Sequence, residues 1–180
     1  MELKKNTKTW KNLETAFAGE SQAFTKYNYF ASQAKKDGFE QISEIFLETA
    51  GNEKEHAKMW YKLLHDGKVG STKDNLTAAA QGENYEWSDM YKTFADEARE
   101  EGYEDIAKMF EGVGAVEKEH ETRYLKLRDN IEHDVVFKSD KVTIWKCRNC
   151  GHIYTGTQAP EVCPVCSHPR AYFEIKANNY

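Results

Sequence analysis

The chain has 180 residues, of which 31% are charged and 39% hydrophobic, and its formal net charge is -5. This length accommodates a helical bundle and one small additional module. Lys and Arg form no cluster, which argues against nucleic acid or an anionic membrane as a partner. No apolar run approaches the roughly 20 residues of a membrane-spanning helix, and residues 1–10 lack the apolar core of a signal peptide.

Apolar residues recur at helical spacing through the first 133 residues. Tight turns are predicted at Asp37-Gly38 and at Glu101-Gly102, and a loop is predicted from Asp66 to Asn75. The predicted helices cover residues 9–36, 39–65, 76–101 and 103–131. Four helices of this length predict a four-helix bundle over residues 1–133.

The second half of the helical region repeats the first. Residues 35–63 align without a gap on residues 99–127, and the motif Glu53-x-x-His56 returns 64 positions later as Glu117-x-x-His120. A helix brings residues i and i+3 to one face, so each motif directs a carboxylate and an imidazole to the same place. The repeat therefore predicts two copies of one helical hairpin that together build one metal site.

Further acidic residues lie on the helices that would face these motifs. Glu20 shares a helix face with Phe17 and Phe24, on the stripe that should be buried, and Glu83 shares a face with Glu86. An unpaired carboxylate on a buried stripe is costly, and a bound metal ion removes that cost. The candidate metal ligands are Glu20, Glu53, His56, Glu83, Glu86, Glu117 and His120.

Five carboxylates and two imidazoles suit iron or manganese better than structural zinc. Five carboxylates around one divalent ion would leave excess negative charge, so two metal ions are expected. A single Glu-x-x-His motif more often lies on a solvated face, as we expect of Glu55 and Glu119. Tyr27 and Tyr91 are either hydrogen-bond donors beside the metals or ordinary core aromatics.

The repeat is imperfect at the ligands. Tyr27 aligns with Tyr91 at the offset of 64, but Glu20 aligns with Asn84, one position after Glu83. Glu86 has no counterpart in the first hairpin. A one-residue insertion in a helix can be absorbed as a π-bulge, often at a functional site. The sequence thus predicts a π-bulge in the third helix.

Residues 134–180 have a different character and are expected to form a small β-rich domain. Two short runs of β-formers, Val135–Phe137 and Val142–Trp145, replace the helical pattern. The pairs Cys147-x-x-Cys150 and Cys163-x-x-Cys166 are separated by twelve residues and predict a tetrathiolate metal site. The spacing fits zinc or a single iron, and a redox-capable carboxylate site in the same chain favours iron. Because all four cysteines are used in this way, a reducing, cytoplasmic location is expected.

Together these residues resemble the rubrerythrin family over nearly the whole chain. The resemblance rests on five motifs: Phe17-Ala18-Gly19-Glu20-Ser21-Gln22-Ala23, Glu53-x-x-His56, Gly82-Glu83-x-x-Glu86, Glu117-x-x-His120, and Cys147-x-x-Cys150-Gly151 with Cys163-Pro164-x-Cys166. It implies a ferritin-like bundle with a non-haem di-iron site, followed by a rubredoxin-like iron domain. The implied activity is reduction of hydrogen peroxide to water in an anaerobe or microaerophile. The implied electron donors are a reduced rubredoxin or an NAD(P)H-dependent reductase.

The resemblance also implies roles for individual residues. Glu53 and Glu117 would bridge the two irons, and Glu20 would be a terminal ligand of one of them. Glu83 and His120 would hold the other iron. Glu86 and His56 would alternate on the first iron, the carboxylate binding when it is oxidised and the imidazole when it is reduced.

The predicted loop from Asp66 to Asn75 has to join the second and third helices along the length of the bundle. A helix of about 25 residues is about 38 Å long, whereas ten extended residues reach at most about 33–36 Å. A connection along the whole bundle is therefore marginal, and a homodimer that exchanges helical hairpins is one solution. The alternative enzyme is a ferroxidase or iron-handling protein that uses the same pocket. A further alternative is a metal-loaded binding module without turnover.

Overall fold

The structure is a computed structural model that describes residues 4–179. Its contacts divide the chain into two compact units, Met1–Gly70 and Ser71–Tyr180, which are considered separately. No helix within the described residues combines the length and the apolar character that crossing a membrane requires. The predicted domain boundary between residues 133 and 134 stays a prediction.

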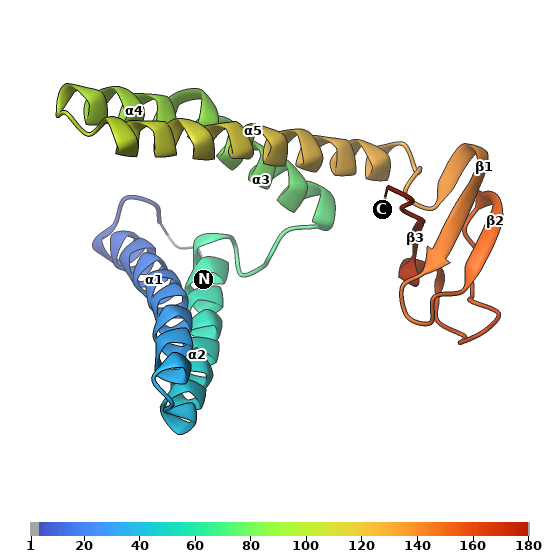
Figure 1. Ribbon diagram of the computed structural model, residues 1–180, viewed down its shortest axis with the longest axis horizontal. Coiled ribbons are helices and arrows are strands. Elements are labelled where there is room, and N and C mark those ends of the chain that lie inside the picture. Colours follow the sequence, from blue (N-terminus) through green and yellow to red (C-terminus); the bar gives the residue numbers. More distant parts are fainter. Residues whose placement is uncertain (1–3, 180) are drawn as a thin grey trace. The chain divides into compact units, whose positions relative to one another are not determined.

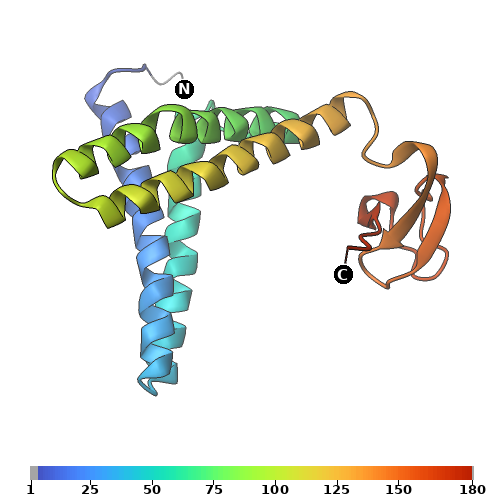
Figure 2. The same ribbon diagram turned by 45° about the horizontal axis from the view of Figure 1, so that its top comes forward.

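The first unit is a helical hairpin of α1 (Lys8–Lys36) and α2 (Glu40–Leu64), which lie side by side in Figures 1 and 2. Thr7 caps the start of α1 by accepting a hydrogen bond from the Trp10 backbone N–H. Gly38 adopts a φ of 85° in the turn, a conformation that favours glycine. Both helices lie where the sequence predicted them, within two residues at each end.

Small residues form the contact between α1 and α2. The side chains of Ala31, Ala34, Ala50 and Ala57 are at most 8% exposed. Ser43 is 5% exposed, and its Oγ donates a hydrogen bond of 2.9 Å to the Ala31 carbonyl oxygen of the opposite helix. The larger apolar side chains of this hairpin, such as Phe30 at 46%, stay substantially exposed. The hairpin is thus closed by alanines and leaves its aromatic residues half uncovered.

The helical part of the second unit repeats this design. It comprises α3 (Thr72–Tyr85), the π-helix η1 (Glu86–Met90), α4 (Tyr91–Glu100) and α5 (Glu104–Glu132). Ala95, Ala98 and Ala107 form its buried contact. The aromatic triangle of Tyr27, Phe30 and Phe46 in the first hairpin has centroid separations of 6.1, 6.1 and 5.6 Å. In the second, Tyr91, Phe94 and Phe110 give 6.3, 6.0 and 5.6 Å, so the repeat seen in the sequence extends to the packing.

The predicted loop from Asp66 to Asn75 is too long. Ser71 caps α3 through a reciprocal capping box with Asp74, so the helix begins at Thr72. We missed this start because the apolar period begins only at Leu76. The connection between α2 and α3 is therefore seven residues, His65 to Ser71.

The predicted π-bulge is confirmed. The α-helical pattern of the third predicted helix is interrupted at Glu86–Met90 by five residues of π-helix and resumes at Tyr91. The interruption lies between Glu83 and Tyr91, where the offset of the repeat changes by one residue. The first hairpin has no such interruption in α1.

The remaining residues form an antiparallel sheet in the order β2-β1-β3, with β1 (Lys138–Cys147), β2 (Ile153–Gln158) and β3 (Phe173–Ile175). A short 3-10 helix, η2 (Arg170–Tyr172), precedes β3. Val142–Trp145 lies in β1 as predicted, but Val135–Phe137 forms no strand, and Phe137 instead packs against the buried core of this sheet. That core is small: Trp145, Cys147, Ala159, Cys163 and Phe173. Two of its five members are candidate metal ligands, consistent with a domain that depends on a metal.

Candidate metal centres

Three candidate ligands meet within the first unit. Glu20 comes from α1, and Glu53 and His56 come from α2. His56 Nδ1 lies 2.9 Å from Glu53 Oε2 and 3.8 Å from Glu20 Oε1. One donor atom from each side chain lies within 4.8 Å of the other two, a spacing at which all three can bind one cation.

The second unit contains a matching triplet. Glu83 comes from α3, and Glu117 and His120 come from α5. His120 Nδ1 lies 2.6 Å from Glu117 Oε2 and 3.8 Å from Glu83 Oε1. These separations nearly repeat those of the first triplet. Six of the seven predicted ligands therefore fall into two equivalent sets.

The electrostatics of both triplets favour a cation. A hydrogen bond with Glu20, followed by one with His56, holds the pKa of Glu53 below its ordinary value. Burial and the neighbouring carboxyl of Glu117 raise the pKa of Glu83. Two carboxyls in such proximity stabilise each other only by sharing a proton or by binding a positive ion. A metal ion would remove the need for the shared proton.

The seventh predicted ligand, Glu86, is the first residue of η1 and lies outside the second triplet. Its charge acts on Glu83 and on Tyr91. Burial, followed by the charges of Glu86, Glu117 and Glu83, raises the pKa of Tyr91, so its phenol keeps its proton. Tyr27 packs in the corresponding aromatic triangle of the first hairpin.

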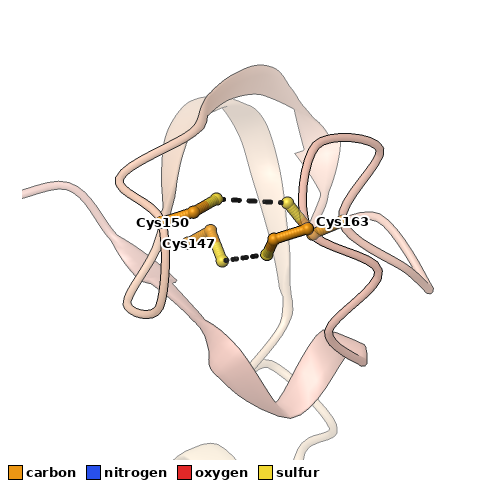
Figure 3. A group of neighbouring side chains, drawn as sticks. Cys147, Cys150 and Cys163 are labelled. Atoms are coloured by element: carbon orange, nitrogen blue, oxygen red, sulfur yellow. Dashed lines mark hydrogen bonds between the residues drawn. The ribbon is translucent and has the colours of Figure 1, made fainter.

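The four cysteines converge as predicted (Figure 3). Cys147 Sγ lies 3.7 Å from Cys166 Sγ, and Cys150 Sγ lies 3.7 Å from Cys163 Sγ. A disulfide requires about 2.05 Å, so these are not disulfides. A metal bound tetrahedrally at about 2.3 Å from each sulfur separates the sulfurs by about 3.8 Å. The observed separations match a tetrathiolate metal site.

Two similar loops position these sulfurs. The Cys147 N–H donates to the His152 carbonyl, and the Cys163 N–H donates to the His168 carbonyl. Each loop passes through a left-handed residue, Gly151 at a φ of 78° in the first and Ser167 at 58° in the second. This conformation turns the chain back so that both cysteines of a pair face the same point.

The pKa values of the cysteine thiols also favour a bound cation. A backbone hydrogen bond at His152 lowers the pKa of Cys150, but the surrounding sulfurs and burial outweigh it and raise that pKa to about 12. The pKa of Cys166 is lowered, first by a backbone hydrogen bond at His168. Four sulfurs that compete for protons in this way become equivalent thiolates once a metal ion replaces the protons.

Sequence reasoning missed one group at the second triplet. Glu121 follows His120 on α5 and accepts hydrogen bonds from Asn84 of α3 and Trp87 of η1. The repeat contained a signal for Glu121. The equivalent position in the first hairpin is Ala57, so the two hairpins differ here by a carboxylate.

Comparison with known proteins decides the family. The family model described as rubrerythrin matches residues 11–128, and the rubrerythrin rubredoxin-like domain model matches residues 145–174. The chain belongs to the rubrerythrin family. It is 50% identical to rubrerythrin-1 of Clostridium acetobutylicum over 100% of both chains. It is 49% identical to the rubrerythrin of Nitratidesulfovibrio vulgaris over 100% of both chains, and 49% identical to that of Porphyromonas gingivalis over 98% of this chain and 94% of the relative.

Membership in the rubrerythrin family establishes the fold class as mostly α, ferritin-like and then rubredoxin-like, as the sequence predicted. The two carboxylate–imidazole sets fit the di-iron site of that family, and the four cysteines fit its rubredoxin-like iron site. The predicted cofactors are thereby confirmed at the level of the donor sets. The chain is an iron-binding member of an oxidoreductase family.

Proposed function

We propose that this rubrerythrin-family chain reduces hydrogen peroxide to water. The balanced reaction takes one peroxide, two protons and two electrons to two waters. The observation that carries the proposal is the presence on one chain of two carboxylate–imidazole triplets and a tetrathiolate group. The first kind of group suits a metal that acts on an oxidant, and the second suits a metal that transfers single electrons.

The proposed di-iron ligands are Glu20, Glu53, His56, Glu83, Glu86, Glu117 and His120, and the proposed ligands of the single iron are Cys147, Cys150, Cys163 and Cys166. When bound, the irons supply Lewis acidity and the electrons that cleave the oxygen–oxygen bond. The chain supplies their charge balance: five carboxylates around the pair and four thiolates around the single iron.

We also propose that Glu86 and His56 exchange as ligands when the oxidation state changes. Two features support this role. The His56 side chain is 49% exposed and can move, and Glu86 lies outside its triplet. A more highly charged ion prefers the anionic oxygen, and a ferrous ion accepts the neutral nitrogen. Tyr91 keeps a phenol O–H near three carboxylates, and we assign Tyr91 and its counterpart Tyr27 as hydrogen-bond donors beside the irons.

The proposed electron donor is a reduced rubredoxin or an NAD(P)H-dependent reductase, and the proposed location is the cytoplasm. The absence of a Lys and Arg cluster supports partners other than nucleic acid or membrane. Electrons would enter through the tetrathiolate group, whose Cys150 is exposed while Cys147 and Cys163 are buried.

Anaerobic peroxide consumption with parallel metal analysis tests the function. Glu53→Ala removes a ligand from the first triplet, and Cys163→Ser removes one thiolate. Both variants should lose turnover, whereas Glu55→Ala, which changes an exposed residue two positions from Glu53, should keep it. Full activity in the two ligand variants would reject the electron path. A ferrous protein that reacts faster with oxygen than with peroxide would instead favour a ferroxidase.

We propose further that the site forms in a homodimer with exchanged hairpins. The connection from His65 to Ser71 has seven residues and reaches at most about 25 Å, whereas the 25 residues of α2 extend over about 38 Å. A connection of seven residues cannot return along a bundle of that length. Exposed aromatic residues on both hairpins, including Phe30 at 46% and Phe94 at 39%, also require a covering surface.

Co-expression of Glu53→Ala chains with Glu117→Ala chains tests whether the two chains of a dimer exchange hairpins. Each variant alone has a damaged site. In an exchanged dimer, a mixed pair combines the intact first hairpin of one chain with the intact second hairpin of the other. Random pairing then restores about a quarter of all sites. Activity that stays at the level of the separate variants would show that all seven ligands come from one chain.

A further inference from the structure

The carboxylate of Glu121 binds two residues on the opposite side of the second hairpin. Its Oε1 accepts a hydrogen bond of 3.0 Å from Asn84 Nδ2, and its Oε2 accepts one of 2.6 Å from Trp87 Nε1. Asn84 directly follows Glu83, and Trp87 directly follows Glu86. The Glu121 side chain therefore binds the residues that directly follow Glu83 and Glu86. Glu121 itself directly follows His120 in the sequence.

Trp87 is the second residue of the π-helix η1. Besides its bond to Glu121, its ring lies 5.4 Å from Lys92 Nζ and 5.2 Å from Lys118 Nζ, within the range of cation–π attraction. A π-turn is an uncommon and unfavourable arrangement of a helix, so it persists where tertiary contacts select it. The hydrogen bond of Trp87 to Glu121 and its two cation–π contacts are the tertiary contacts that stabilise the π-turn here.

Packing on both sides of η1 explains why these contacts decide its position. On one side Ala80 of α3 is 3% exposed, and on the other Ala95 of α4 is 2% exposed. Both helices therefore pack against the rest of the hairpin, and the extra residue is accommodated in the segment between them. A shift of one residue rotates a side chain by about 100° around the helix axis, so the place of the π-turn decides the direction of Glu86.

The first hairpin provides an internal comparison. It lacks the π-turn, and it also lacks the contact that holds it. At the position equivalent to Glu121 stands Ala57, which is 8% exposed, and at the position equivalent to Asn84 stands Glu20. The inserted residue, the extra carboxylate of Glu86 and the Glu121 contact thus occur together in one hairpin and are together absent from the other.

We propose that Glu121 is a positioning residue that keeps the π-turn at Glu86–Met90 and so directs Glu86 toward the metals. This inference rests on the proposed di-iron function, because Glu86 has a direction to keep only if it binds metal. Glu121 lies outside the triplet of Glu83, Glu117 and His120, and its two oxygens accept the hydrogen bonds from Asn84 and Trp87. Its role resembles that of the hydrogen-bonded groups that orient metal ligands in other sites.

Cobalt(II) titration of the full-length, metal-depleted protein tests the proposal together with amide hydrogen exchange. Cobalt at the tetrathiolate group has an intense sulfur charge-transfer absorption that reports folding and loading of that site independently. Glu121→Ala should accelerate exchange of the amides at residues 86–90 and weaken cobalt binding at the carboxylate site about tenfold, the lower end of the effect of such orienting groups. The tetrathiolate absorption should not change.

Three further variants separate positioning from general stability. Glu121→Gln keeps an acceptor oxygen and should recover most of the affinity. Trp87→Phe keeps an aromatic ring but removes the N–H, and should reproduce part of the loss even if Glu121→Ala fails to fold. Glu111→Ala is the matched control, because it removes a different cross-helix carboxylate contact of this hairpin, to Arg99, and should leave cobalt binding unchanged.

The outcomes distinguish the two proposals. If the unmodified protein binds cobalt at the carboxylates and Glu121→Ala binds it equally well, positioning by Glu121 is wrong and the proposed function stands. That conclusion holds whether or not amide hydrogen exchange at residues 86–90 becomes faster. If the unmodified protein binds no cobalt at the carboxylates, the proposed function fails, and the role of Glu121 fails with it.

Discussion

Replacing Glu83 by Gln should change the stability of this protein in opposite directions with and without metal. In the metal-free protein, Glu83 and Glu117 are two carboxyls held close together, and burial and Glu117 already raise the pKa of Glu83. Removing one negative charge relieves that repulsion. In the metal-loaded protein, the same substitution removes a charged ligand and weakens the site.

The structure gives the size of the effect. Donor atoms of Glu83 and Glu117 lie within 4.8 Å. At that separation two unit charges repel by about 1 kcal/mol in water and by about 3.5 kcal/mol at an effective dielectric constant of 20. The side chains are 19% and 14% exposed, so the relief lies between these limits. For a protein of this size, each kcal/mol shifts the unfolding temperature by about 2–4 °C.

Thermal unfolding at pH 8, after chelation and again after metal loading, measures both directions. Glu119→Gln removes the same charge from an exposed position on α5 and should change stability by less than about 0.5 kcal/mol. A metal-free Glu83→Gln protein that unfolds at a lower temperature than the parent would refute the reasoning, as would an effect that metal loading does not reverse.

Three other substitutions have defined outcomes. Ser43→Ala removes the buried hydrogen bond to the Ala31 carbonyl and should lower the free energy of unfolding by about 1 kcal/mol in urea titration. Asp129→Asn should destabilise the protein at pH 7, and this destabilisation should diminish as the pH falls below 3.8. The reason is that its hydrogen bond with Arg128 lowers the folded-state pKa of Asp129 below 3.8, so its contribution is present above 3.8 and is lost as the pH falls through that lowered value. Cys163→Ser should weaken the visible absorption of the tetrathiolate iron and shift it to shorter wavelength, because one of four sulfur ligands is lost, while circular dichroism of the helices is unchanged.

Each of these predictions has a contrary result. Ala107 occupies the position of Ser43 in the second hairpin, so alanine fits there, and an unchanged urea midpoint would show that the bond contributes nothing. A destabilisation of Asp129→Asn that does not diminish as the pH falls below 3.8 would exclude the carboxylate charge as its cause. An iron spectrum that is identical in Cys163→Ser and in the parent would show that Cys163 does not bind the metal.

The sequence alone determined the local parts of this protein. Glu53 and His56, like Glu117 and His120, share a helix face because a helix of any origin places residues i and i+3 together. The cysteine pairs are equally local, since a short loop brings both sulfurs of each pair to one point. Even the π-turn was foreseeable, because two repeats whose offsets differ by one residue cannot both be regular helices.

The tertiary structure decided which separate elements meet. No local pattern showed that Val135–Phe137 would lie outside the sheet and that Phe137 would join its core. The contact of Glu121 with Asn84 and Trp87 spans more than 30 residues and depends on the register between two helices. Such contacts depend on the distance and direction between packed side chains, and the spacing of residues along one helix does not contain that information.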